Sequence, residues 1–198
     1  MDKPGAGGDS YAIAMVGNPN TGKTSIFNAL TGETQSVGNY PGVTVEKRRG
    51  QYVCGDDEYM VTDLPGTYSL SSFSIEEKLA TEAITGEDLD GLIVVADANS
   101  LGRSLVILAQ VMQTGANPVL CLNMIDEAKA SGLEIDRAKL QLLLGIPVVE
   151  TVGNRGLGIS ELKKAVQTLV SRPPTRPRLV FGVRLTKAIE QISNELLK

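Results

Sequence analysis

Histidine and tryptophan are absent from this 198-residue chain, and cysteine occurs only twice. Without histidine the protein has no histidine-ligated zinc or copper site and no Ser-His-Asp triad, so a metal ion has to be bound by oxygen atoms. Cys54 and Cys121 lie in separate predicted strands, which argues against a disulfide framework.

Long apolar runs are missing as well. The longest, at 91–96 and 118–122, are far shorter than the roughly 18 residues that cross a bilayer, and residues 1–10 lack the apolar core of a secretory signal. Lys and Arg total 19 against 23 Asp and Glu, and the net charge of −4 argues against broad attraction to nucleic acid or anionic lipid. We therefore expect a soluble, cytosolic chain with no nucleic-acid partner.

Hydrophobic residues make up 42% of the chain and charged residues 21%, as in a globular protein with a buried core. The length suits one domain of nucleotide-binding size and little more. Short apolar runs alternate with amphipathic stretches, which predicts an α/β fold with a mostly parallel six-stranded sheet, one antiparallel hairpin strand and helices on both faces. Strands are expected at 11–16, 45–53, 58–62, 91–97, 118–123 and 147–151, and helices at 23–30, 75–84, 104–113, 136–144 and 160–170.

The sequence divides into four parts. We expect a flexible N-terminus at 1–10, a main domain at 11–171, a proline-rich linker at 172–181 and the start of a truncated helical domain at 182–198. Proline fixes the backbone and removes a donor, which is typical of a linker. Beyond the linker, apolar residues recur at helical spacing, at Leu185, Ile189, Ile192 and Leu196. This last helix either folds back onto the main domain or begins a separate helical domain.

A GxxxxGK[ST] motif directly follows the first predicted strand, in the strand-loop-helix context that it requires. Its residues are Gly17, Asn18, Pro19, Asn20, Thr21, Gly22, Lys23 and Thr24, followed by Ser25. In such a loop consecutive N–H groups point at phosphate oxygens, helped by the positive end of the next helix. We expect Lys23 to reach the β and γ phosphates and the Thr24 hydroxyl to bind Mg²⁺. The alternative is a glycine-rich turn with a stray lysine.

A second motif, Asp63-Leu64-Pro65-Gly66, ends the strand at 58–62. It places a carboxylate at the sheet edge where ligands of α/β folds collect. We expect Asp63 to hold Mg²⁺ through water and the Gly66 N–H to contact the γ phosphate. A DxxG pattern is weak by itself, because an acid before a turn glycine is common, but the preceding phosphate loop strengthens it.

A third motif, Asn123-Met124-Ile125-Asp126, ends the strand at 118–123. An aspartate there accepts hydrogen bonds from N1–H and the exocyclic amine of guanine, two donors that adenine does not offer together. We therefore expect GTP and GDP rather than ATP as ligands, with Asn123, Met124 and Asp126 around the base. The alternative is that Asp126 only caps the following helix.

Between the first helix and the hairpin lies a loop at 38–46 rich in residues that interrupt helices and strands. In a GTP-binding protein a threonine in this loop adds its hydroxyl to the Mg²⁺ shell and its N–H to the γ phosphate. We assign this role to Thr44, with Gly42 and Val43 beside it, and expect the loop to be mobile without GTP. Thr34, which lies closer to the helix, is the alternative.

These elements, in this order, resemble the TRAFAC class of GTPases over residues 11–170. The fuller strings at 17–20, 38–47, 63–70, 76–78 and 123–126 are similar to the N-terminal G domain of the FeoB family of bacterial ferrous iron transporters. The resemblance implies a P-loop GTPase fold at the cytoplasmic face of the inner membrane. It also implies a helical spacer, a membrane-embedded transport region in the same full-length chain, and a nucleotide switch that regulates Fe²⁺ uptake.

The resemblance further implies a role for Asn20, because the P-loop asparagine of FeoB-like and TrmE-like proteins helps to hold a potassium ion. Such a cation neutralises charge that grows on the phosphates in the transition state. The alternative is that Asn20 only supports the hydrogen bonds of its own loop. Thr67 stands where Ras-like proteins carry the glutamine that orients the attacking water. We therefore expect slow hydrolysis, with catalytic roles for Lys23, Thr44, Gly66 and Asn20.

Two base-binding elements depart from the general GTPase pattern. Met124 replaces the usual lysine that packs beside the base, and Val152-Gly153 replaces the expected Ser-Ala pair. A backbone N–H near Gly153 still reaches the guanine carbonyl, but without the serine the loop is less braced. We expect Val152, Gly153 and Asn154 to line the base site, with weak nucleotide affinity and fast release.

Two other functions compete with a transporter GTPase. A ribosome- or RNA-associated assembly GTPase of the Era/Der type shares the phosphate loop, but such proteins need a basic RNA-binding module, and the acidic balance counts against one. A GTP-dependent binding module with negligible turnover is the other, motivated by Thr67. The sequence leaves the oligomeric state open, a homo-oligomer included.

Overall fold

The computed structural model describes residues 8–32, 35–71, 73–86 and 89–171. Several expectations concern residues outside these ranges: most of the N-terminal segment, the alternative threonine Thr34, the linker at 172–181 and the helix at 182–198. None of the helices in the described ranges combines the length and the apolar character that a bilayer crossing requires.

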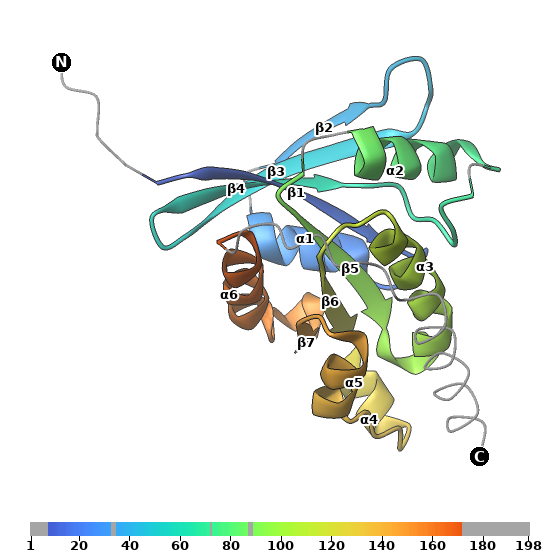
Figure 1. Cartoon of the computed structure of the whole chain (residues 1–198), viewed down its shortest axis with the longest axis vertical. Coiled ribbons are helices and arrows are strands. Elements are labelled where there is room, and N and C mark those ends of the chain that lie inside the picture. Colours follow the sequence, from blue (N-terminus) through green and yellow to red (C-terminus); the bar gives the residue numbers. More distant parts are fainter. Residues whose placement is uncertain (1–7, 33–34, 72, 87–88, 172–198) are drawn as a thin grey trace.

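A seven-stranded sheet forms the centre of the domain (Figure 1). The strand order is β2-β3-β4-β1-β5-β6-β7; β3 is antiparallel to both of its neighbours, and the other pairs are parallel. The strands are β1 Ser10–Gly17, β2 Gln35–Asn39, β3 Glu46–Cys54, β4 Asp57–Asp63, β5 Gly91–Asp97, β6 Pro118–Asn123 and β7 Val148–Glu150. Because parallel strands end at the same edge, the motifs that follow β1, β4 and β6 gather there.

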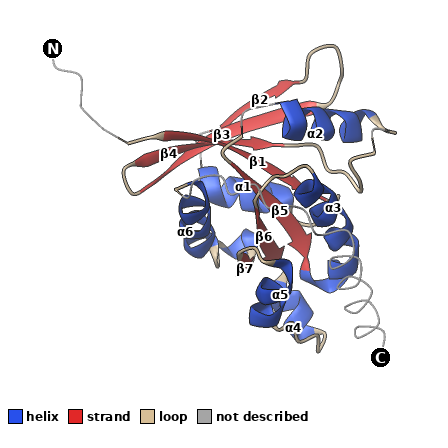
Figure 2. Ribbon diagram, viewed as in Figure 1, coloured by secondary structure: helices blue, strands red, loops and turns tan. Residues whose placement is uncertain are grey.

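Helices cover both faces of the sheet (Figure 2). Alternate residues of β1 therefore enter two separate cores. Ile13 and Met15 pack with α1 and α6, whereas Ala14 and Val16 pack with α2, α3 and α5 on the other face. This alternation is what a strand covered on both sides requires. The helices are α1 Lys23–Thr31, α2 Ile75–Gly86, α3 Leu101–Gln113, α4 Ile125–Ala130, α5 Arg137–Leu144 and α6 Ile159–Val170, with short 3₁₀ turns η1 Ala98–Ser100 and η2 Gly153–Arg155.

The predicted α/β fold is confirmed, but the prediction misses the strand β2 and the short helix α4. β2 is a mostly exposed edge strand whose residues, Gln-Ser-Val-Gly-Asn, show no apolar alternation, so only its pairing with β3 defines it. The expected loop at 38–46 is correspondingly shorter: its first two residues belong to β2, its last begins β3, and only residues 40–45 form a turn.

Both cysteines are free thiols, which confirms the expectation that no disulfide joins them. Cys121 is fully buried in β6, and burial raises the pKa of its thiol to about 12. A thiol with so high a pKa stays protonated at neutral pH and behaves as a small apolar core residue.

Candidate functional site

The phosphate loop runs from the end of β1 into α1 and is closely packed. A Cβ atom on Gly17 would lie 2.5 Å from the Val95 carbonyl oxygen, so only glycine fits there. Gly22 and Asn20 have positive φ angles of 74° and 65°, which glycine adopts freely and asparagine tolerates better than most residues. The side chain of Asn20 is exposed. The backbone conformation therefore favours asparagine at this position even without a bound cation.

Lys23, the first residue of α1, points toward the end of β4. Its Nζ donates hydrogen bonds to the Asp63 carboxylate and, at 2.6 Å, to the Leu64 carbonyl oxygen. Burial raises the pKa of Asp63, and the nearby Lys23 charge offsets part of that rise. The structure thus brings the predicted phosphate-binding lysine and the predicted metal-binding carboxylate into direct contact.

The segment that follows β4 lies against the phosphate loop. A Cβ atom on Gly66 would lie 3.4 Å from Pro19, and the Thr67 N–H donates to the Gly17 carbonyl oxygen at 3.1 Å. Thr67 is buried, and its hydroxyl donates to the Ser69 carbonyl oxygen at 2.6 Å. Because this hydroxyl is engaged within its own turn, the geometry supports the expectation that Thr67 does not orient an attacking water.

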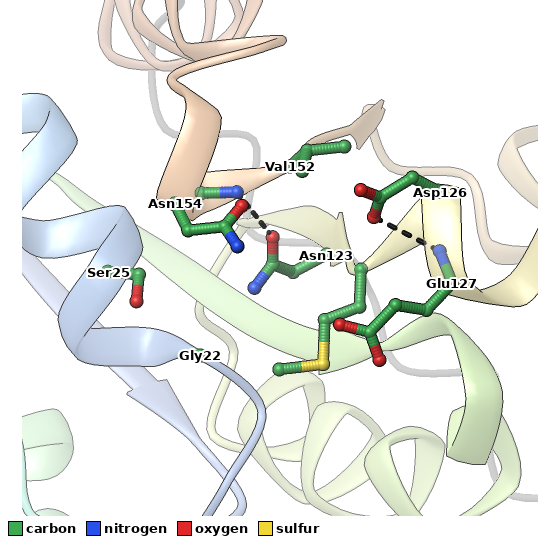
Figure 3. A pocket seen from close by; sticks show the side chains of 9 residues that line it. Gly22, Ser25, Asn123, Asp126, Glu127, Val152 and Asn154 are labelled. Carbon is green, nitrogen blue, oxygen red and sulfur yellow. Dashed lines mark hydrogen bonds between the residues drawn. The ribbon is translucent and has the colours of Figure 1, made fainter.

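The Asn123 side chain joins three segments at the C-terminal edge of the sheet. It is 2% exposed. Its Oδ1 accepts from the Gly153 N–H at 2.9 Å (Figure 3). Its Nδ2 donates to the Thr21 carbonyl oxygen at 2.9 Å, and its Oδ1 also accepts from the Thr151 hydroxyl at 3.2 Å. Asn123 therefore positions the phosphate loop and the loop after β7 relative to each other.

We expect Asn123→Ala to destabilise the nucleotide-free domain by about 3 kcal/mol, because it leaves buried groups without partners at about 1–3 kcal/mol each. This corresponds to a fall in Tm of roughly 6–12 °C. Thermal unfolding followed by circular dichroism measures it. The matched control is Asn154→Ala, at an exposed position of the same pocket, which should leave the Tm unchanged. Equal Tm values for both variants and the unsubstituted chain would contradict the bracing role.

A pocket lies between the β6–α4 junction and η2 (Figure 3). Asp126 stands in the first turn of α4, where one carboxylate oxygen accepts from the Glu127 N–H at 3.1 Å and the other lies 3.8 Å from Arg155 Nη1. Two carboxylate oxygens can accept from the paired donors on the guanine edge. The sequence predicted every lining residue except Glu127; they are Gly22, Ser25, Asn123, Met124, Asp126, Glu127, Val152, Gly153 and Asn154.

Met124 retains the packing role that the usual lysine stem would have. Its methyl group is close to the phosphate loop, since a Cβ atom on Gly22 would lie 3.2 Å from Met124 Cε. Met124 itself has a φ of 60°, in the left-handed region. The half-buried thioether therefore lines the pocket beside Gly22 of the phosphate loop without adding a charge.

The loop after β7 is better held than the sequence suggested. The Gly153 N–H donates to Asn123 at 2.9 Å. The expected contact between the guanine carbonyl and a backbone N–H near Gly153 stays a prediction. A Cβ atom on Gly153 would lie 2.9 Å from Ile26 Cδ1. Backbone hydrogen bonds of 3.1 and 3.3 Å between Val152 and Leu157 close the loop. Asn123 thus supplies the bracing that was expected to be lost with the serine.

Thr24 lies in the first turn of α1 beside Lys23, with its side chain exposed. Its hydroxyl and the Asp63 carboxylate are hard oxygen donors, the type that Mg²⁺ prefers. Within residues 8–32, 35–71, 73–86 and 89–171, no three His, Cys, Asp or Glu side chains lie close enough together to bind a metal ion.

Thr44 is not placed at the phosphate end of the site. It is exposed in the turn between β2 and β3 (Figure 1), which the Tyr40 N–H closes by donating to the Val45 carbonyl oxygen at 2.9 Å. Gly42 and Val43 lie in the same turn. The phosphate and metal contacts assigned to Thr44 remain predictions, and they require this turn to move toward α1.

Sequence reasoning missed Thr151 and Arg155. Thr151 is buried directly after β7, and its hydroxyl donates to Asn123; the signal for it is a polar residue at the end of an apolar strand. Arg155 approaches Asp126 from η2. The signal for Arg155 is a single cation inside the glycine-rich segment 153–158.

Comparison with known proteins gives a consistent result. The family model described as "Ferrous iron transport protein B" matches residues 11–166. The Fe(2+) transporters FeoB of Salmonella typhimurium and Escherichia coli K12 are 44% and 43% identical over 158 residues. These alignments cover 78% of the chain but only 20% of each relative, so the chain spans about a fifth of the length of these transporters.

Solved structures agree with this assignment. The G domain of T. maritima FeoB matches with a TM-score of 0.76 and 43% identity, over 81% of this chain and 98% of that one. The G domain of Methanococcus jannaschii FeoB matches with a TM-score of 0.74 and 42% identity, over 83% and 99%. The cytosolic domain of T. maritima FeoB in its GMPPNP form gives 0.82 and 41%, over 95% and 75%. The chain therefore belongs to the FeoB family, and its described residues form a G domain of that family.

Proposed function

We propose that this chain binds GTP together with Mg²⁺ and hydrolyses it to GDP and phosphate, as the cytosolic nucleotide switch of an Fe²⁺ transporter. One observation carries the proposal: the buried Asn123 side chain joins the phosphate loop to the base pocket, so both ends of a nucleotide site lie on one rigid support. Membership of the FeoB family favours this function over an RNA-associated one. GDP and GMPPNP forms of the T. maritima cytosolic domain support guanine nucleotides as the ligands.

The proposed activity follows from the positions of the chain's own groups. Loop N–H groups at the start of α1 bind phosphate oxygens, and Lys23 leaves Asp63 to contact them. The Gly66 segment, already in contact with Pro19, reports on the γ phosphate through its N–H. Thr24, Asp63 through water, and Thr44 once its turn has moved would hold Mg²⁺, which would supply positive charge to the phosphates.

The larger assembly belongs to the same proposal. Residues 11–171 act as the G domain in this proposal, while the expected linker at 172–181 and the segment at 182–198 lie outside the described residues. The membrane-embedded region of the full-length chain is the partner to which the nucleotide state is transmitted. In this proposal the G domain works at the cytoplasmic face of the inner membrane.

We expect hydrolysis by this chain to be at least roughly tenfold faster in potassium than in sodium buffer, because a cation held near Asn20 neutralises charge in the transition state. Phosphate release from GTP, with ATP as the competing substrate, measures the rate. Asn20→Ala should remove the potassium effect and leave GDP binding intact. Asn20→Gly, which keeps the positive φ angle without an amide, separates the loss of a ligand from a change of backbone conformation.

Three results would count against this proposal. Equal rates in the two salts would remove the cation-assisted mechanism and leave a slow switch. No turnover in either salt, with GDP still bound, would favour a binding module. A preference for ATP would overturn the guanine assignment at Asp126.

A further inference from the structure

An ion pair joins the two segments that line the base pocket. Asp126 belongs to the first turn of α4, and Arg155 is the last residue of η2. Arg155 Nη1 lies 3.8 Å from Asp126 Oδ2. The backbone at Arg155 is fixed, because its N–H donates to the Val152 carbonyl oxygen at 3.0 Å, so the guanidinium is presented toward Asp126 by an ordered turn.

Arg155 faces an atom that a guanine base needs. Asp126 Oδ1 already accepts from the Glu127 N–H at 3.1 Å, and Oδ2 faces Arg155. Guanine donates from N1–H and from its exocyclic amine, so it uses both oxygens of the carboxylate. A guanidinium and the guanine edge present the same kind of paired donors, so they compete for the acceptor sites of Oδ2.

We propose that Arg155 competes with guanine for the Asp126 carboxylate, so that this ion pair sets how tightly the empty pocket accepts a guanine nucleotide. The inference rests on the proposed nucleotide function and adds a specificity-determining residue to it. In the empty pocket Arg155 neutralises the carboxylate of Asp126. A base that does not donate to both oxygens of this carboxylate leaves the ion pair in place.

The exposure of the pair determines its strength. The side chains of Arg155 and Asp126 are 63% and 39% exposed, and ion pairs at such positions change an equilibrium by about two- to fivefold. Competition of this size tunes affinity without preventing binding. It should also weaken with added salt, since the Debye length falls from about 10 Å at 0.1 M to about 3 Å at 1 M.

A single substitution at Arg155 mixes two effects, because the same cation also attracts an anionic nucleotide from a distance. A second background separates them. Asp126→Asn replaces the carboxylate with an amide, which suits xanthine because xanthine has a carbonyl oxygen where guanine has the amine. In that background Arg155 has no carboxylate to pair with, while its attraction for XDP persists.

The test measures dissociation constants of fluorescent GDP and XDP for the full chain. The corrected ratio is the gain in GDP affinity caused by Arg155→Gln, divided by the gain in XDP affinity that the same substitution causes in the Asp126→Asn background. We expect this corrected ratio to be about two to five. The gain should shrink at 1 M salt. Arg137→Gln is the matched control: it removes the same charge from an exposed ion pair with Glu161 in α6, and its corrected ratio should be 1.

A corrected ratio of 1 for Arg155→Gln would overturn the proposal. A ratio below 1 would do the same, because it would show that Arg155 contacts the bound base instead of competing with it. If XDP does not bind to the Asp126→Asn variant, the dissociation constants for GDP decide the question alone. The ratio of these constants between Arg155→Gln and Arg137→Gln is then compared at low and at high salt. Failure of the unsubstituted chain to bind GDP is a different result: it removes the proposed function, and the competition with it.

Discussion

Lys23→Met is expected to lower the affinity for GTP and GDP by about 10²–10⁴-fold. The side chain of Lys23 is 11% exposed, so its ammonium interacts with the phosphates with little screening by water. Hydrogen bonds to charged groups contribute about 1.5–3 kcal/mol each, and two of them account for this loss at 1.4 kcal/mol per tenfold change. Titration with fluorescent GDP, or calorimetry at high protein concentration, measures it.

Methionine keeps the length of the stem, so the substitution removes the charge with little change in packing. The substitution also removes the cationic partner of Asp63 in the nucleotide-free protein. The stability of the nucleotide-free variant is therefore a readout separate from its nucleotide affinity. The control is Lys129→Met, which removes a charge from an exposed pair with Glu150 and should bind GDP normally. A dissociation constant within fivefold of the unsubstituted chain would show that Lys23 does not contact phosphate.

Asp126→Asn is expected to reverse the choice between guanine and xanthine. The amide places a donor where the carboxylate accepted from guanine, so two charge-assisted hydrogen bonds are lost and GDP affinity falls by about 10²-fold or more. XDP gains a matching partner and should bind better than GDP. The ratio of the two dissociation constants, measured for the variant and the unsubstituted chain in one buffer, gives the result.

Glu127→Gln is the matched control for this reversal. Glu127 lines the same pocket, and its side chain is exposed, so the substitution removes an equal charge without touching the base-reading carboxylate. It should leave the preference for GDP unchanged. If Asp126→Asn still prefers GDP over XDP, Asp126 serves only as a helix-terminal residue of α4, the alternative that the sequence left open.

The sequence predicts those parts of the site in which the functional groups lie close together along the chain. The phosphate loop at Gly17 to Thr24 can be predicted from a short stretch of sequence, because its glycines and the helix N-terminus lie next to one another in the chain. Asp63 and Asp126 were assigned from their places at the ends of β4 and next to β6, where parallel strands deliver side chains to one edge. The same local logic predicted eight of the nine residues that line the base pocket.

The features that the sequence did not predict depend on tertiary contacts. No pattern indicates that the Gly153 N–H is taken by Asn123, since these residues belong to different loops. β2 has no apolar period of its own and is defined by its partner strand. The contact of Lys23 with Asp63 likewise joins residues on different elements. In each case the decisive neighbour is distant in sequence, and motif spacing does not encode it.

The bracing by Asn123 has a consequence for how this site can change over time. One amide fixes the Thr21 carbonyl oxygen on the phosphate side and the Gly153 N–H on the base side. A substitution of Asn123 therefore changes phosphate binding and base discrimination together. Variants that alter nucleotide turnover while preserving the choice of base should arise elsewhere, in segments such as the turn at 40–45 that Asn123 does not hold.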